Sequence, residues 1–452
     1  MKKFLALILC LCFVCCGLVF VGCGKEPEIV LNGGPAYEDK IYGNGGMVVT
    51  KGDYVYFTES YLKSSAIASS TTVDVNNVTE TGIYRAKLST KIEGEGDNAV
   101  EKPVLENVEL MVSKIAGFEN AGLYIFKDKL YFATPTTAQD STGIRYDLVT
   151  FYSCNLDGSN LTKFYQTEEF SSGKFSMTMI DQEVFLMIYT GSDVIVVSEN
   201  GTAKTIASEV TGVLFPTRVN VISNEENPLF NETFVYYTID KEQEGSVETG
   251  NILYRASIKT GDETELLNED RISVSLIQIE SNRIFYVKNS VYGSASTYAY
   301  YSNTIGQNFL NTETKHSNLG TTSTTSLVNL GVYNGKNLGF AYINSGSKLV
   351  TKNFDGTDGD VLVEDISKIL TVRNGYLYYT YSSKFYRISL TEADATRQEL
   401  SKATPSLTIK TDYFDIDEDF FYFFAENKNK SNKLSIYRVD LSAKEKTPQL
   451  MA

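Results

Sequence analysis

The sequence predicts an all-β fold, a single β-propeller built from four-stranded antiparallel blades. Short runs rich in Val, Ile, Tyr, Phe and Thr recur along the chain between Gly, Asn and Asp, a composition typical of strands joined by turns. No amphipathic helical stretch of any length interrupts them. An aromatic-rich strand also recurs eight times, at Tyr56-Phe57, Tyr131-Phe132, Phe185-Leu186, Tyr236-Tyr237, Phe285-Tyr286, Gly339-Phe340, Tyr378-Tyr379 and Tyr422-Phe423.

The spacing of this strand gives the repeat length. From Tyr56 to Tyr422, seven intervals cover 366 residues, so each repeat has about 52 residues, which is typical of propeller blades. The pattern predicts eight blades, with seven or six as the alternatives. The eighth unit, residues 412–451, has a complete set of strands, so we expect the ring to close by pairing of this unit with the first.

Within each unit we expect four strands in sequence order. Unit 4 predicts strands near 219–222, 233–238, 251–258 and 263–268. In unit 7, Asn374-Gly375 between two apolar strands predicts a tight hairpin, because both residues tolerate positive φ. The third strand carries a recurring Tyr-Arg step whose adjacent residues point to opposite faces, so that one can pack between blades while the other reaches solvent. A structural role is favoured over ligand binding for these arginines: Tyr84-Arg85, Tyr254-Arg255, Tyr386-Arg387 and Tyr437-Arg438.

The connections differ between the two ends of the blades. The turns between first and second strands are short, and so are most turns between third and fourth strands, although residues 89–102 of unit 1 form a long polar stretch. The connections between second and third strands vary in length. Because insertions in repeat proteins collect on one face, often the binding face, we expect ligand contact at the long loops 60–81, 135–146, 240–250 and 290–298.

The densest group of tyrosines, Tyr292, Tyr298, Tyr300 and Tyr301, falls in and after the loop of unit 5. A tyrosine ring combines an apolar face with a polar tip, which suits sugar rings or peptide. Tyr292, Tyr298 and Tyr300 are therefore the predicted ligand-binding residues, with core packing between blades as the alternative.

The N-terminus has the layout of a secretory signal, with Lys2 and Lys3 followed by an apolar run over residues 4–21 and then Gly22-Cys23. A small residue directly before Cys resembles the lipobox of bacterial lipoproteins. The resemblance implies a signal peptide at 1–22, a lipid on the Cys23 sulfur, a tether at 23–46 and a propeller at 47–452, held at the extracytoplasmic face of the cell membrane. An uncleaved apolar anchor is the alternative, and it too leaves residues from about 30 onward outside the cell.

Charge and cysteine content agree with such a location. The whole chain carries a formal −15, and loss of residues 1–22 would leave 39 basic and 56 acidic residues. This acidic balance argues against nucleic acid and anionic lipid as partners. Beyond Cys23 only Cys154 remains, so no intramolecular disulfide is expected in the mature chain.

Two segments carry a second resemblance. Tyr254-Arg255-Ala256 leading to Lys259-Thr260-Gly261, and Phe151–Asn160, are similar to the third strand and turn of YWTD-type and TolB-like propeller repeats. The resemblance implies a propeller, usually six-bladed in those families. It implies no particular activity, because propellers host many unrelated functions.

The search for catalytic chemistry is largely negative. His316 is the only histidine and lies in a polar run, so a catalytic triad or a His/Cys metal site is not expected. Asp415, Asp417 and Asp419 alternate as Ca²⁺ ligands do, but the glycine and glutamate of such a loop are missing, which favours ordinary turn acids. We expect no cofactor and no metal.

The sequence therefore predicts a membrane-anchored, non-enzymatic binding or scaffold propeller for a protein or glycan. Two alternatives remain open: a glycan-active enzyme that uses loop carboxylates, and an accessory subunit of an envelope complex.

Overall fold

The computed structural model describes residues 41–59, 72–73, 82–94, 99–113, 122–135, 139–140, 143–145, 149–167, 174–215, 234–242, 250–280, 283–292, 295–304, 313–315, 328–330, 332–333, 336–337, 340–343, 346–352, 358–392, 395–402, 407–427 and 433–451. The chain divides into two units, Met1–Glu38 and Asp39–Ala452. All described residues belong to the second unit. The predicted signal peptide, Cys23 and His316 lie outside the described residues.

Eight four-stranded antiparallel sheets follow one another along the chain. Blades 1 to 4 consist of β1 (Val48–Lys51), β2 (Tyr54–Glu59), β4 (Gly82–Glu93) and β5 (Val100–Ser113); β6 (Tyr124–Phe126), β7 (Lys129–Pro135), β10 (Val149–Asn155) and β11 (Thr162–Gln166); β12 (Lys174–Ile180), β13 (Glu183–Tyr189), β14 (Val194–Ser198) and β15 (Ala203–Ala207); and β16 (Val210–Leu214), β17 (Phe234–Asp240), β18 (Asn251–Ser257) and β19 (Glu263–Leu267).

The second half of the chain repeats the same order of strands. Blades 5 to 8 consist of β20 (Ile272–Glu280), β21 (Arg283–Tyr292), β22 (Ala295–Thr304) and β23 (Thr314–Lys315); β24 (Val328–Asn329), β27 (Phe340–Ile343), β28 (Leu349–Lys352) and β29 (Asp358–Val363); β30 (Lys368–Arg373), β31 (Tyr376–Tyr381), β32 (Lys384–Ser389) and β33 (Gln398–Glu399); and β34 (Leu407–Ile416), β35 (Phe420–Asn427), β36 (Lys433–Asp440) and β37 (Gln449–Leu450). Within blade 6, β25 (Val332–Tyr333) and β26 (Lys336–Asn337) form a separate hairpin between β24 and β27.

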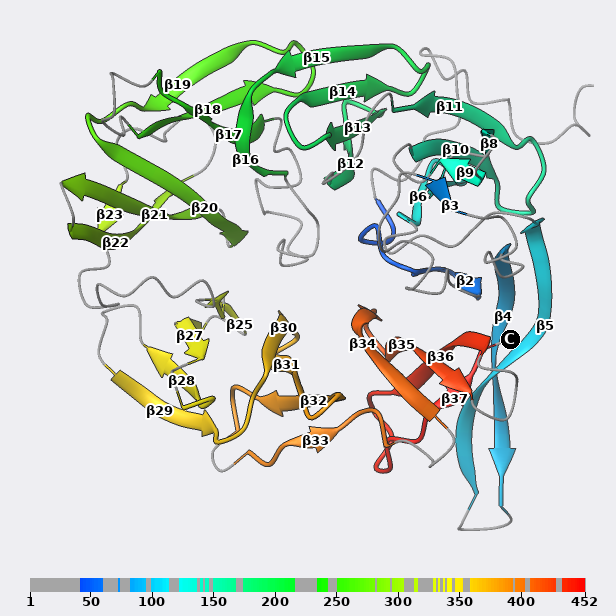
Figure 1. Ribbon diagram of the computed structural model, residues 1–452. Helices are drawn as coiled ribbons and strands as arrows, with labels where there is room; N and C mark the ends of the chain where they lie inside the picture. Colours follow the sequence, from blue (N-terminus) through cyan, green and yellow to red (C-terminus); the bar gives the residue numbers. More distant parts are fainter. Residues whose placement is uncertain are drawn as a thin grey trace, which may run out of the picture. The chain divides into compact units, whose positions relative to one another are not determined.

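The eight sheets form a ring, a β-propeller with no helix among the described residues, in which the first strand of each blade lies innermost and the fourth outermost (Figure 1). The prediction of eight blades is confirmed. Each predicted aromatic strand is the second strand of a blade. One strand was misplaced: the first strand of blade 4 is Val210–Leu214, whereas the predicted segment 219–222 lies outside the described residues.

The aromatic pattern follows from the two faces of the second strand. Successive residues of a strand point to opposite faces. Phe57 therefore packs at the seam with blade 8, where it stacks on Tyr84 with ring centroids 5.9 Å apart, while Tyr56 packs at the seam with blade 2. The same second-to-third-strand stacking recurs in five more blades, in the pairs Phe132–Tyr152, Tyr237–Tyr254, Tyr286–Tyr301, Tyr379–Tyr386 and Phe423–Tyr437.

The core is divided among the seams. Each of the eight contacts between neighbouring blades has its own cluster of buried apolar residues. Among the described residues, the seam between blades 5 and 6 has the smallest cluster, with Phe285, Tyr300 and Phe340 as its buried members. Apolar burial at every seam is what holds the ring together.

The ring closes between blade 8 and blade 1 by side-chain packing, so the expected strand pairing between these units is not found among the described residues. The closing contact centres on the buried carboxylate of Asp415 in β34. One carboxylate oxygen accepts the backbone N–H of Val48 at 3.0 Å; the other accepts the Asn44 amide at 3.0 Å and the Ile416 N–H at 2.8 Å. The approach is so close that a Cβ on Gly46 would lie 2.2 Å from this carboxylate.

The chain reaches blade 1 along the inner strand of blade 2. Tyr42 exchanges two backbone hydrogen bonds of 3.0 Å with Ile125 of β6 in an antiparallel bridge, and Leu123 donates to the Gly46 carbonyl at 3.1 Å. Residues 42–46, predicted as the end of a tether, are therefore hydrogen-bonded to the propeller.

Blade 1 carries a projecting arm instead of the predicted polar loop 89–102. Strands β4 and β5 continue as a paired ribbon as far as Glu93 and Val100 (Figure 1). Gly, Glu and Asp dominate the tip of this segment, which made it look like a loop, but Thr90, Ile92 and Val104 continue the strand pattern. The Pro103 carbonyl at the base of the arm accepts a hydrogen bond from Arg438 of blade 8 at 3.1 Å.

Candidate functional site

The two ends of the ring are built differently. In an antiparallel blade, the first–second and third–fourth turns lie at one end, which we call the short-turn face. The second–third connections lie at the other end, which we call the long-loop face. The predicted binding loops belong to the long-loop face.

On the long-loop face, the insertions of blades 1 and 2 join each other. Strand β3 (Thr72–Val73) of the blade 1 insertion pairs with β9 (Gly143–Arg145) of the blade 2 insertion, and β9 pairs with β8 (Gln139–Asp140). The pairing places Thr72 opposite Arg145 and Val73 opposite Ile144. Two insertions from different blades thus form one three-stranded sheet, which the sequence pattern did not predict.

The predicted loop 290–298 of blade 5 is wrong. Strands β21 and β22 stay paired out to Tyr292 and Ala295, so two residues separate them. These two residues are Gly293 and Ser294, and a two-residue connection that begins with glycine is typical of a tight β-hairpin. The tyrosines assigned to a loop therefore belong to strands.

Their strand positions separate the predicted ligand-binding tyrosines. Tyr300 is only 3% exposed and packs with Phe285 and Phe340 between blades 5 and 6, so its ring lies in the core. Tyr301 points to the opposite face and stacks on Tyr286. Tyr298 is half-buried. Tyr292 is placed by its pairing with Ala295, and its side chain lies outside the described part of the structure.

A buried lysine lies in the same hairpin. The ammonium group of Lys288 is paired with Glu313 at 2.8 Å and with Glu269, and it lies 4.5 Å from the centre of the Tyr301 ring. Tyr286 donates its hydroxyl proton to Glu313 at 2.6 Å. Burial opposes the charge of Lys288, but the hydrogen bonds to the two carboxylates outweigh it and raise the pKa of the ammonium group.

This cluster fixes the connection between blades 4 and 5. Glu269 lies in that connection, and its backbone carbonyl accepts a 2.6 Å hydrogen bond from Lys241 at the base of the blade 4 loop. Both carboxylates are occupied by Lys288, so we assign the cluster a structural role. Sequence analysis passed over Lys288. The available signal was a single lysine within the apolar strand Ile284–Tyr292.

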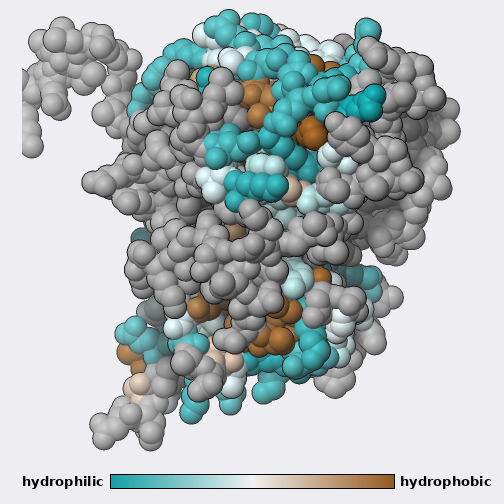
Figure 2. Space-filling model, turned by 90° about the vertical axis from the view of Figure 1, so that its left-hand side faces the viewer, coloured by the Kyte–Doolittle hydropathy of each residue, from teal (hydrophilic) through white to brown (hydrophobic). Residues whose placement is uncertain are grey.

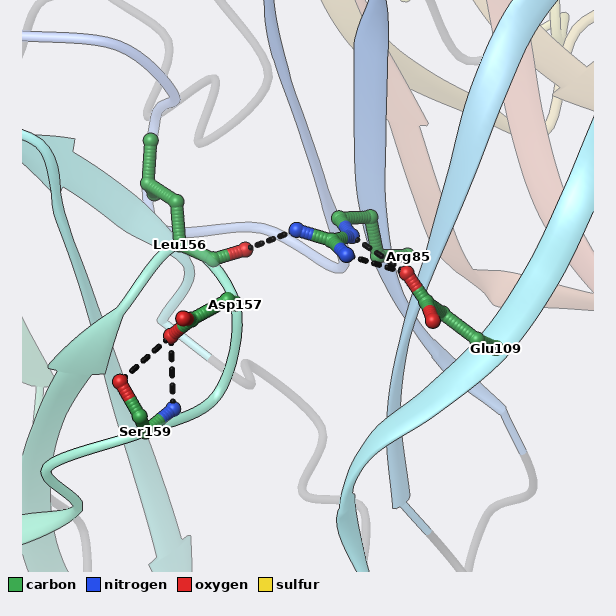
Figure 3. A network of polar contacts seen from close by, with 5 residues as sticks. All are labelled: Arg85, Glu109, Leu156, Asp157 and Ser159. Atoms are coloured by element: carbon green, nitrogen blue, oxygen red, sulfur yellow. Dashed lines mark hydrogen bonds and ion pairs between the residues drawn. The ribbon is translucent and has the colours of Figure 1, made fainter.

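The short-turn face is held by arginines that bridge neighbouring blades. Arg85 of blade 1 donates to the Leu156 carbonyl of blade 2 at 2.8 Å and to Glu109 on its own fourth strand at 2.8 Å (Figure 3). Its guanidinium also lies 5.1 Å from the centre of the Tyr54 ring, within cation–π range. One side chain therefore joins three strands of blade 1 to blade 2.

The turn that presents the Leu156 carbonyl is fixed by Asp157. Its carboxylate accepts the backbone N–H of Ser159 at 2.9 Å and the Ser159 hydroxyl at 2.6 Å (Figure 3). These hydrogen bonds lower the pKa of Asp157. Gly158 completes the turn with φ of +83°, and a Cβ there would lie 2.9 Å from the Met111 carbonyl of blade 1.

The same arginine arrangement recurs in two other blades. Arg387 donates to Gln398 on its own fourth strand at 2.8 Å and to the Leu441 carbonyl of blade 8 at 2.6 Å; Arg438 donates to Gln449 at 3.2 Å and to Pro103 of blade 1. Each guanidinium lies over the aromatic ring that begins its second strand. These contacts confirm a structural role for the arginines of three of the four Tyr-Arg steps. Arg387 and Arg438 are buried, so the expectation that one residue of the step reaches solvent is wrong there.

Ion pairs add further links between blades on this face. Lys127 of blade 2 pairs with Glu199 of blade 3 at 3.2 Å, and Asp181 of blade 3 pairs with Lys259 of blade 4 at 2.7 Å. Ion pairs that are open to solvent contribute little to stability. These four charged side chains of the short turns are nevertheless paired with each other, within the molecule.

The alternating acids of blade 8 are occupied in the same way. Asp417 accepts the N–H groups of Asp419 and Phe420 at 2.9 and 2.7 Å and the Tyr422 hydroxyl at 2.5 Å. Burial raises the pKa of Asp415 to about 6. The acids thus hold the turn and the closing seam, as the turn interpretation predicted, and no group of metal-ligating residues occurs among the described residues.

Viewed from the side of blades 5 and 6, the described residues present mostly hydrophilic surface with separate apolar patches (Figure 2). The described part of the chain also contains no helix long and apolar enough to cross a membrane.

No family model matches the chain, and no curated protein matches it in sequence. It is similar to the β-propeller domain of the Trilobed protease from Pyrococcus furiosus, with 8% identity over 89% of this chain and 95% of that one and a TM-score of 0.38. It is also similar to a prolyl endopeptidase, with 9% identity over 86% of this chain and 54% of that one and a TM-score of 0.41. It is similar as well to a chain of the nidogen/laminin complex, with 12% identity over 57% of this chain and 89% of that one and a TM-score of 0.30. At such values none of these proteins indicates what this chain does.

Proposed function

We propose that the chain is a lipid-anchored extracytoplasmic lipoprotein, attached through Cys23, whose propeller is a non-enzymatic binding or scaffold module for a protein or glycan. Its binding surface is the long-loop face over blades 1 and 2. One observation carries the proposal: insertions from two blades join in the sheet β3–β9–β8 at this face, while the opposite face is occupied by contacts between blades.

The arrangement of charged groups supports a module without catalysis. The buried carboxylate of Asp415 accepts hydrogen bonds from the protein itself, and the two carboxylates around Lys288 are paired with that lysine. A catalytic acid or base instead needs a position from which it can reach a substrate. The acidic balance of the chain favours a neutral or basic partner.

The anchor is tested on protein extracted from membranes with detergent. Intact mass should show a chain that begins at Cys23 and carries a lipid, and Cys23→Ala should abolish the modification. A native chain that retains residues 1–22, or one with an unmodified Cys23, contradicts the anchor.

The binding surface is tested with a glycan array and with affinity capture from solubilised envelope. Replacement of residues 136–148, the blade 2 insertion that carries β8 and β9, by a two-residue turn should leave the blade intact, because β7 and β10 are paired out to Pro135 and Val149. It should weaken ligand binding, because it removes two strands of the joined sheet. Thr202→Arg, on an exposed short turn of blade 3, is the matched control and should not affect binding. If Thr202→Arg abolishes binding and the loop replacement does not, the ligand binds the short-turn face and the proposed surface is wrong. Chemical conversion of a bound glycan would show an enzyme.

A further inference from the structure

The direction in which the chain joins the ring defines which face lies nearer an N-terminal anchor. Tyr42 is hydrogen-bonded to Ile125, and Gly46 lies opposite Leu123, so residues 42–46 run antiparallel to β6. Strand β6 runs toward the turn Lys127-Asp128 on the short-turn face. Residues 42–46 therefore enter the ring from the short-turn face, and only after Gly46 does the chain turn back into β1.

We propose that the propeller is held with its short-turn face toward the membrane and its long-loop face outward, as the surface that meets partners. The proposal rests on the lipid anchor proposed above, and adds to it the side from which a partner must come.

The length of the intervening chain supports this orientation. Cys23 and Tyr42 are 19 residues apart, and a flexible chain of that length has a root-mean-square span of about 24 Å. To bring the long-loop face to the membrane, the chain must pass a blade width of about 14 Å and a strand length of about 23 Å, as for seven-residue β13. This detour of about 37 Å stretches the chain well beyond its mean span, whereas the short-turn face is reached directly.

Two exposed positions in blade 3 allow a matched test. Ser192 lies between β13 and β14 on the long-loop face, and Thr202 lies between β14 and β15 on the short-turn face. Cys154 is 1% exposed, and burial raises the pKa of its thiol to about 12, so it will not compete for a thiol-reactive dye. Ser192→Cys and Thr202→Cys thus each provide one reactive thiol in the lipidated protein.

Each dye-labelled variant is incorporated into phosphatidylcholine vesicles that contain an acceptor-labelled lipid, and energy transfer is measured. Transfer should be stronger from position 202, with an apparent difference in distance to the bilayer of about 17 Å, the length of five residues. Equal transfer from both positions, or stronger transfer from position 192, overturns the orientation.

Two controls separate the causes. Vesicle flotation reports the anchor alone: protein that does not float overturns the lipid anchor and the orientation with it, whereas floating protein with equal transfer overturns only the orientation. A tether lengthened by about 30 Gly/Ser residues has a longer mean span and should remove the difference in transfer. A difference that persists in that variant shows that the tether does not set the orientation.

Discussion

The closing seam between blades 8 and 1 should respond to pH in a direction unusual for an aspartate. Burial raises the pKa of Asp415 from 3.8 to about 6. The folded state therefore holds this proton more tightly than the unfolded state, so the free energy of unfolding falls as the pH rises from 3.8 to about 6 and stays at the lower value above that range. A shift of this size lowers the free energy of unfolding at neutral pH by about 3 kcal/mol. Acidification from pH 7 to pH 4.5 should restore about 2 kcal/mol of this loss.

Asp415→Asn removes the titration with little change in shape. Its amide group replaces a carboxylate oxygen that accepts the Val48 N–H, so two donors would face each other, at a cost of about 1–3 kcal/mol. At pH 7 this loss nearly cancels the gain from removing a buried charge. At pH 4.5 the native protein should be the more stable of the two, because Asp415 is then largely protonated.

The measurement is urea unfolding of both proteins at pH 7.0, 6.0, 5.0 and 4.5, followed by tyrosine fluorescence in a chain with 30 Tyr and no Trp. The difference in unfolding free energy should change by about 2 kcal/mol across this range. Parallel pH profiles for the two proteins would show that Asp415 does not titrate there, and would refute the reasoning.

The effect of Asp440 on stability should depend on pH in the opposite direction. Although Asp440 is partly buried, hydrogen bonds from Ser442 and Ala443 lower its pKa, so it contributes stability above its unfolded pKa that is lost as the pH falls through the folded pKa. Asp440→Asn should therefore reduce the loss of unfolding free energy at acidic pH, as measured by urea unfolding. Arg438→Ala should reduce the unfolding free energy by about 3 kcal/mol or more, because Arg438 is 1% exposed and its removal leaves a cavity and two half-buried acceptors, on Pro103 and Gln449, without their donor. Arg85→Ala should lose only about 1 kcal/mol, because Arg85 is partly exposed and its partner Glu109 is exposed. Equal losses would contradict the role given to burial. Tyr300→Ala should destabilise by about 3 kcal/mol or more and Tyr298→Ala by about 1 kcal/mol, both measured by urea unfolding; the reverse order would place Tyr300 outside the core. Cys154 should resist iodoacetamide at pH 8 in the native protein and react after unfolding, and rapid native labelling would show that its seam opens.

The repeated part of the fold could be predicted from sequence because it depends on local pattern. Tyr56-Phe57 and its seven counterparts serve two seams at once, so each blade needs an aromatic-rich second strand, and counting them gave the blade number. The Tyr-Arg step was equally readable, since an arginine in a buried strand needs partners nearby.

Contacts between distant segments could not be predicted in this way. Thr72 pairs with Arg145 across 73 residues, and Glu269 and Glu313 reach Lys288 from both sides along the chain. No local period encodes such partners. Tyr300 and Tyr301 occupy opposite faces of β22. Their assignment depended on how far β21 and β22 stay paired, and the polar composition of this segment had suggested a longer loop.

The attachment of residues 42–46 to β6 determines how tension would pass into the ring. A pull on the N-terminal side of Tyr42 acts along the strand direction, so it loads the two hydrogen bonds to Ile125 together, in shear, and does not peel them apart one after the other. The force enters blade 2 before it reaches blade 1. The closing seam at Asp415, which joins the first and last blades, thus lies behind this attachment and is shielded from the load.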